Sequence, residues 1–281
     1  MLKQRVITAL ALLLVLIPAV LYPDPTLFLL LMLAFIAAAG WEWARMNQFA
    51  GTPSLLGAVF CVGICSGSWW LGLIQQSIPE LWLVAGGLWV LMSAWVLRAG
   101  VSAWSAHPRW LRLFFGLLAL CLTWLAVAQA RLVGVNFLMS ILALAWVADI
   151  GAYFAGRAYG GRFTHSKLAV SISPGKSWEG VWGGAVGVIV LAFGWQYLDT
   201  VNTSQIPSLY TLLGQRGWVF LVIAAVFMTA MSVVGDLVES LVKRSAGVKD
   251  SSALLPGHGG VLDRIDALVP TLPLAMMLFT Y

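Results

Sequence analysis

Long apolar runs alternate with short polar segments along the whole chain. An α-helix needs about 20 apolar residues to cross a hydrocarbon core of about 30 Å, so each long run is a candidate membrane span. The candidates fall at residues 6–22, 26–43, 54–75, 81–98, 111–130, 136–156, 178–197, 217–242 and 267–281, and the last is the shortest. The pattern predicts an all-α integral membrane protein with about nine transmembrane helices.

The composition agrees with this prediction. Hydrophobic residues make up 61% of the 281 residues and charged residues only 10%, whereas a soluble domain has about 25% charged residues. So few charges cannot cover a soluble surface. Cys61, Cys65 and Cys121 lie inside apolar runs with no histidine nearby. We therefore interpret the cysteines as packing residues rather than as a metal or redox site.

The distribution of basic residues predicts how the helices are oriented. If the N-terminus is cytosolic, every Lys and Arg except Arg131 and Arg216 falls in or next to a cytosolic loop, as the positive-inside rule requires. This orientation explains the net charge of +5 without nucleic acid as a partner. It also places two polar loops, 157–177 and 243–266, in the cytosol, where we expect them to form the functional site.

Carboxylates lie where two predicted spans reach the cytosolic side. The eighth span is apolar or small over residues 217–235, and Asp149 ends a similar run in the sixth span at about the same depth. Four polar residues then continue the eighth span on one helix face, because they are spaced i, i+3, i+4 and i+7. They are Asp236, Glu239, Ser240 and Lys243.

Two more acids follow in "DRID", where Asp263 and Asp266 share a face if a helix has begun. A helix cap would explain one of them but not both. Oxygen ligands without a Cys or His cluster suit Mg²⁺. Whether a second, monovalent cation also binds is left open. For Asp149, an ion-paired or snorkelling acid is an equal alternative. The predicted metal ligands are Asp149, Asp236, Asp263 and Asp266.

Basic residues and glycines surround these acids. Lys and Arg side chains bind phosphate oxygens that a metal leaves free, and glycines let backbone N–H groups approach an anion. "GKS" at 175–177 is not a P-loop, because Val170 stands where that motif has glycine. The positive-inside rule alone is the alternative for Lys176, and a structural role in a tight loop is the alternative for His258. The predicted substrate-binding residues are Ser173, Lys176, Ser240, Gly259 and Gly260.

Residues 240–266, "SLVKRSAGVKDSSALLPGHGGVLDRID", resemble the signature of the phosphatidate cytidylyltransferase family, also called CDP-diacylglycerol synthases. The family pattern is Ser, two residues, Lys-Arg, four residues, Lys-Asp, then Pro-x-His-Gly-Gly and Asp-Arg-x-Asp. "GDLVES" and "SPGKSWEG" resemble the family as well. The chain departs from it at Asp149, which is followed by Ile150 where members often have Ser or Thr. The signature is met by Ser240, Lys243, Arg244, Lys249, Asp250, Pro256, His258, Gly259, Gly260, Asp263, Arg264 and Asp266.

The resemblance implies transfer of the cytidylyl group of CTP to phosphatidate, with CDP-diacylglycerol and pyrophosphate as products and Mg²⁺ as cofactor. It also implies a homodimer among membrane lipids, in a bacterial-type inner (plasma) membrane with its site facing the cytosol. We divide the chain into a scaffold of N-terminal helices with dimer contacts, 1–135, and a catalytic region, 136–281. The residues that the resemblance marks as catalytic are Lys243, Arg244, Lys249, Asp250, His258 and Arg264.

Two other classes of protein fit the residues without the resemblance. One is a different CTP-dependent lipid enzyme, such as a polyprenol kinase; the Asp-Gly-x-x-Ala-Arg motif of CDP-alcohol phosphotransferases is absent from the sequence. The other is a transporter whose acids form an ion path, although a transporter has less reason to cluster Lys and Arg beside a Gly-Gly loop. Cytidylyl transfer needs no protein nucleophile, because the lipid phosphate itself attacks the α-phosphorus.

Overall fold

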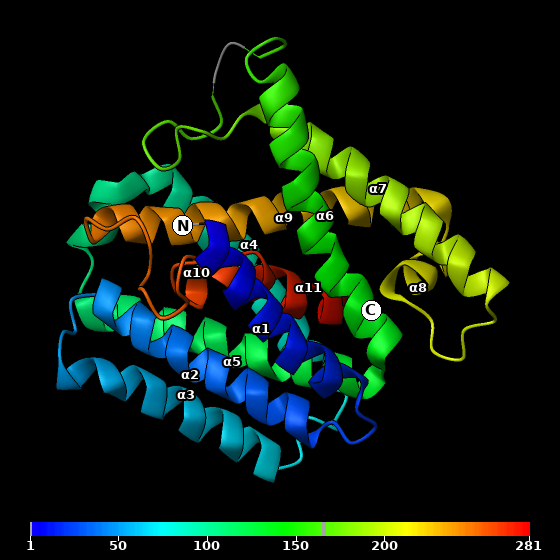
Figure 1. Ribbon diagram of the computed structural model, residues 1–281, viewed down its shortest axis with the longest axis horizontal. Helices are drawn as coiled ribbons and strands as arrows, with labels where there is room; N and C mark the ends of the chain where they lie inside the picture. Colours follow the sequence, from blue (N-terminus) through cyan, green and yellow to red (C-terminus); the bar gives the residue numbers. More distant parts are fainter. Residues whose placement is uncertain (1, 165–166) are drawn as a thin grey trace.

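The computed structural model describes residues 2–164 and 167–281, which form helices joined by loops (Figure 1). Within these ranges there is no strand, only isolated bridges between Ala169 and Ser173 and between Leu255 and Gly259. The helices are α1 (Leu2–Leu21), α2 (Thr26–Met46), α3 (Thr52–Trp70), α4 (Pro79–Ala106), α5 (Arg109–Val133), α6 (Val135–Tyr159), α7 (Trp178–Val201), α8 (Leu209–Gln215), α9 (Trp218–Ser245), α10 (Leu262–Ile265) and α11 (Leu268–Thr280).

Seven of the described helices, α2 to α7 and α9, are long and apolar enough to cross a membrane. They correspond to the second to eighth predicted spans, and they confirm the all-α fold. The first and ninth predicted spans are also helical, but the apolar part of α1 is only Val6–Leu21 and α11 has 13 residues. Both apolar runs are shorter than the about 20 residues that usually cross a membrane, so the count of nine stays a prediction.

Helix α11 is a core helix enclosed by other helices. Every residue from Val269 to Met276 is buried, and α11 contacts α4, α5, α6, α8 and α9. A helix that is apolar on all sides is buried inside a protein or in a membrane, and one of 10–14 residues fits the core of a protein better. The apolar run at the end of the sequence therefore fills the centre of the bundle.

The other helices pack around this centre in groups. Helices α2, α3 and α5 lie side by side, and α4 packs against α9 and α11 (Figure 1). Helices α6 and α7 pair along a stripe of small residues, where Gly183 and Gly184 of α7 face Ala148, Gly151 and Ala155 of α6. These small residues thus allow a close helix contact within one chain.

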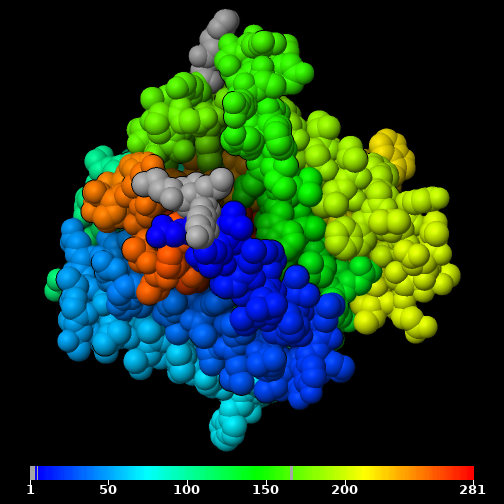
Figure 2. All heavy atoms as spheres, viewed as in Figure 1, coloured from blue at the N-terminus to red at the C-terminus, as the bar shows by residue number. Residues whose placement is uncertain are grey.

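The first helix lies beside the glycine-rich loop near the end of the chain. Thr8 Oγ1 of α1 donates a hydrogen bond of 2.9 Å to the carbonyl of Pro256. Figure 2 shows α1, in dark blue, next to the orange segment that contains this loop. Residues that are 248 positions apart in sequence are therefore neighbours at the end of the bundle that carries the signature residues.

Candidate active site

Three carboxylates from two segments converge beside the C-terminal part of α9. Asp236 and Glu239 lie one turn apart on α9, and Asp266 follows the short helix α10. One carboxylate oxygen from each residue lies within 4.8 Å of the other two. Glu239 is only 4% exposed, and its oxygens accept no hydrogen bond apart from their ion pair with Lys243. Buried carboxylate oxygens this close to one another favour a shared cation.

The approach of α9 to Asp266 depends on a glycine. A methyl group on Gly235 would overlap the backbone oxygen of Asp266 and would lie 2.8 Å from the side chain of Pro270. Because Gly235 has no side chain, the backbone of α9 comes directly against the start of α11. The next residue, Asp236, is thereby brought beside Asp266.

Charges from two other segments adjoin the three carboxylates. Lys176, in the loop before α7, forms an ion pair of 2.6 Å with Asp236. Asp149, on α6, is close enough to Asp236, Lys176 and Arg264 to interact with their charges. Burial, followed by the negative charge of Asp236, raises the pKa of Asp266 to about 7. Burial and the neighbouring carboxylate thus both disfavour the ionised form of Asp266.

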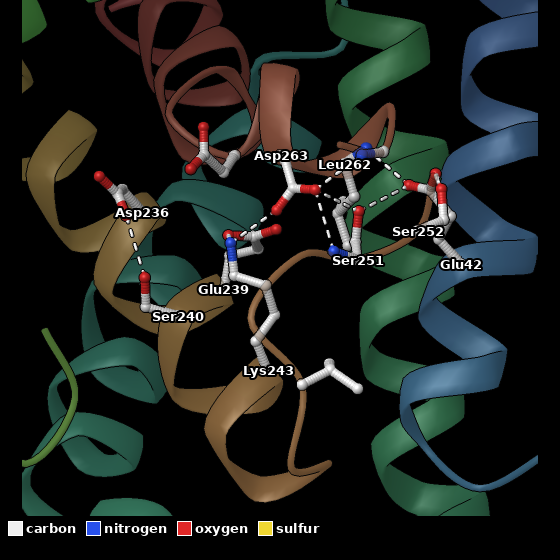
Figure 3. Close-up of polar contacts among 12 residues, drawn as sticks. Glu42, Asp236, Glu239, Ser240, Lys243, Ser251, Ser252, Leu262 and Asp263 are labelled. Carbon is white, nitrogen blue, oxygen red and sulfur yellow. Dashed lines mark hydrogen bonds and ion pairs between the residues drawn. The ribbon is translucent and has the colours of Figure 1, made fainter. Parts of the chain in front are cut away.

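Asp263 lies beside this group and is engaged by the protein itself. Its Oδ1 accepts from Lys243 Nζ at 2.6 Å, and its Oδ2 accepts from the backbone N–H of Ser251 and of Gly260 at 2.9 and 2.8 Å. Burial acts to raise its pKa, but these hydrogen bonds outweigh burial and lower the pKa of Asp263 to about 2. Lys243 is shared between Asp263 and Glu239 (Figure 3), so it links the two halves of the site.

Glu42 of α2 holds the loop that carries Asp263. The side chain is fully buried, and its carboxylate accepts from the backbone N–H of Val261 and Leu262 at 2.9 and 2.7 Å. It also accepts from Ser251 Oγ at 3.1 Å and Ser252 Oγ at 2.5 Å. Figure 3 shows the resulting chain of contacts from α2 through Ser251 to Asp263. A carboxylate with four donors is well satisfied without a basic partner.

The remaining predicted residues take other places around the site. Arg244 donates to the carbonyls of Ile172 and Val248, at 3.3 and 3.4 Å, and so ties the two loops together. Ser240 Oγ donates to Asp236 at 3.1 Å. Ser173 and His258 are half-buried members of their loops, and Gly259 and Gly260 shape the second loop. The predicted residues that are exposed are Asp149, Arg244, Lys249, Asp250 and Arg264.

The structure thus brings Asp236 and Asp266 together. The third carboxylate of this group is Glu239, and Asp263 lies beside the group. Glu42 was missed by the sequence analysis. It stands in the second predicted span, far from the signature, and Arg45 three residues later suggests an ordinary ion pair. Arg45 instead stacks on Trp41, at 4.5 Å from the ring centre. An ionisable residue inside an apolar run was the signal available, because such residues are rare and need polar partners.

Comparisons with known proteins agree with the sequence signature. A model described as "Cytidylyltransferase family" matches residues 3–281. The phosphatidate cytidylyltransferase of Pseudomonas aeruginosa is 38% identical over 275 residues, which cover 97% of this chain and 95% of that protein. The protein of the same name from Haemophilus influenzae is 38% identical over 292 residues, with coverage of 97% and 96%.

Replacement of Glu42 by glutamine is expected to destabilise the protein. All four partners of Glu42 are donors. The NH₂ group of a glutamine would therefore face the N–H of Val261 or Leu262. A buried donor would be left unsatisfied, at a cost of about 1–3 kcal/mol. We expect a fall of several degrees in the thermal unfolding temperature of the detergent-solubilised chain. The matched control, Glu80→Gln, changes an exposed acid of α4 and should leave this temperature unchanged. Equal temperatures for both variants would contradict the role of Glu42.

Replacement of Gly235 by alanine is expected to push α9 away from Asp266. Forcing a methyl group into a filled space costs about 1–3 kcal/mol, so the unfolding temperature should fall. Gly194→Ala is the control, because nothing lies within 4 Å of its added methyl group and alanine favours a helix. A Gly235→Ala protein as stable as the Gly194→Ala protein would show that the helices are not in close contact there.

Proposed function

The chain belongs to the cytidylyltransferase family, and from this premise we propose that its acidic site transfers the cytidylyl group of CTP to phosphatidate. The products are CDP-diacylglycerol and pyrophosphate. The protein is a membrane-bound nucleotidyltransferase of phospholipid biosynthesis. A polyprenol kinase or a transporter is not favoured, because relatives that cover almost the whole chain carry the name phosphatidate cytidylyltransferase.

The observation that carries the proposal is the convergence of Asp236, Glu239 and Asp266 beside Lys176. Oxygen ligands alone, with Lys243 as the partner of Glu239, suit a hard divalent cation such as Mg²⁺. We therefore propose that these three acids hold Mg²⁺, with Asp149 and Asp263 as their neighbours. The ion, when bound, supplies positive charge to the phosphates of CTP.

The residues of the chain then act by positioning and by charge. One phosphate oxygen of the lipid attacks the α-phosphorus of CTP, the bond to the β-phosphate breaks, and pyrophosphate leaves. The attacking oxygen is already anionic, so the protein supplies no nucleophile and no strong base. Lys176 and the exposed Lys249 and Arg264 neutralise phosphate charge. Lys243 and Arg244 hold the acids and the two loops in place.

An apolar cavity next to the acids supports a lipid substrate. It has a volume of about 160 Å³, and Glu239 and Asp266 stand at its polar side. The rest of its wall comes mainly from α4 and α5, with Trp43, Trp89 and Ala119 among the lining residues. A lipid whose phosphate reaches the acids can place part of an acyl chain in this cavity, where burial contributes about 0.8 kcal/mol per CH₂ group.

We further propose that the site faces the cytosol of a bacterial-type inner membrane and that the chain forms a homodimer. The positive-inside distribution of Lys and Arg supports the orientation. CTP then reaches the acids from the cytosol, and phosphatidate reaches them from within the bilayer. The mass of the detergent-solubilised protein, measured by light scattering, tests the dimer.

The direct test is an assay of the purified full chain with labelled CTP, phosphatidate and Mg²⁺. We expect pyrophosphate and CDP-diacylglycerol; phosphorylated lipid with CDP would indicate a kinase instead. Asp266→Asn should lower the rate at least 100-fold, about 2.7 kcal/mol in the barrier. Asp24→Asn, at an exposed acid between α1 and α2, should stay within twofold of wild type. An Asp266→Asn rate above one tenth of the wild-type rate would reject the role of this carboxylate.

The cavity predicts a change in acyl-chain preference. Ala119→Phe fills part of the cavity, so we expect its rate with dipalmitoyl phosphatidate to fall relative to its rate with dioctanoyl phosphatidate, by about tenfold. Ala94→Phe makes the same change at an exposed position of α4 and should leave the ratio unchanged. The same ratio for both variants would show that the acyl chain lies elsewhere.

A further inference from the structure

Arg112 is a buried cation for which the described part of the chain shows no ion pair. It lies in the first turn of α5 and is only 5% exposed. Its Nε has no hydrogen-bond acceptor, and it belongs to none of the ion pairs found among the described residues. Arg131, at the other end of α5, is buried as well but donates to the carbonyl of Tyr22 at 2.6 Å.

Such an arginine is costly to the protein. A guanidinium in apolar surroundings loses its hydration, and the loss is repaid only by an anion or by well-placed acceptors. The residues that follow Arg112 on α5, Leu113 and Leu117, are buried and apolar. An unpaired buried cation therefore points to an anion that binds from outside the chain.

A second buried donor, on Trp104, is connected to Arg112 through Trp43. The indole N–H of Trp43 donates to the backbone carbonyl of Arg112 at 3.0 Å, and the ring of Trp43 meets that of Trp104 edge to face at 6.0 Å. The indole nitrogen of Trp104 is buried and has no acceptor. A guanidinium and an indole N–H thus both lack partners around one tryptophan.

This group of donors adjoins the apolar cavity. Trp43 and Trp104 line it, as do Phe115 and Gly116, which lie three and four residues after Arg112 on the same face of α5. The side chain of Trp43 takes the space that a side chain at Gly116 would need. The cavity therefore extends from Trp104, Phe115 and Gly116, one turn after Arg112 on α5, to Glu239 and Asp266.

Adjacent residues of α2 contact this group and the acidic site. Glu42 binds the loop before Asp263, and its neighbour Trp43 donates to the backbone carbonyl of Arg112. Without a bound cation the carboxylates repel a phosphate, whereas the guanidinium of Arg112 attracts it.

We propose that Arg112, with the indole N–H of Trp104, binds the phosphate of a phosphatidate molecule whose acyl chain enters the cavity. The choice of lipid rests on the proposed function. A phosphate monoester carries more negative charge than the diester of other phospholipids, and the planar guanidinium can bind two of its oxygens at once. The lipid would bind beside the acidic site before the transfer reaction, with its acyl chain already in the cavity.

Binding of dioctanoyl phosphatidate to the purified full chain, measured by calorimetry in EDTA and without CTP, tests the proposal. EDTA removes divalent cations, so the acidic site repels the phosphate. We expect Arg112→Met to weaken binding at least tenfold. Arg109→Met removes an exposed arginine from the same turn, which stacks on Phe49 at 5.2 Å, and should stay within twofold of wild type. Dioctanoyl phosphatidylglycerol should bind wild type at least tenfold more weakly than phosphatidate.

Thermal unfolding of the lipid-free protein separates binding from a structural role. Removal of an unpaired buried charge should not lower the unfolding temperature, so Arg112→Met should be at least as stable as wild type. Unchanged phosphatidate binding by Arg112→Met, or equal binding of phosphatidylglycerol, would overturn the proposal. Absence of turnover with CTP in wild type would refute the proposed function alone, because the binding measurement requires no reaction.

Discussion

Repulsion among one buried and two half-buried carboxylates is the constraint on which this structure depends. Asp236, Glu239 and Asp266 lie within 4.8 Å of one another at the end of an apolar helix, where little water can screen them. Such an arrangement persists only if the surrounding backbone is fixed firmly. The contact at Gly235, the shared Lys243 and the pair between Lys176 and Asp236 each serve this purpose.

The two regions of the chain are joined through α2. Glu42 fixes the loop that bears Asp263, and Trp43, the next residue, contacts α5 and lines the cavity. One turn of a helix from the first fifth of the chain therefore supports both the polar and the apolar part of the site. The N-terminal helices supply walls and hydrogen bonds as well as a scaffold.

Much of this could be predicted from the sequence, because membrane spans and clustered charges leave strong local patterns. The second to eighth spans followed from apolar length, and the grouping of Asp236 with Asp266 followed from the clustered acids and the family signature. The place of Glu239 did not, because Glu239 and Asp263 both pair with Lys243, and only packing decides that the backbone of Ser251 and Gly260 binds Asp263. The enclosed position of α11 could not be predicted either, since a core helix and a membrane span are equally apolar.

The ion pair between Lys176 and Asp236 has a consequence for how the site fills. Lys176 comes from a loop, so its ammonium serves as a temporary counter-ion for a carboxylate on a fixed helix. A divalent cation held by Asp236 would compete with Lys176 for the same oxygen and would release its ammonium. The ammonium, carried by a loop, would then be free to neutralise phosphate charge. Asp236 would in that case exchange one positive partner for another.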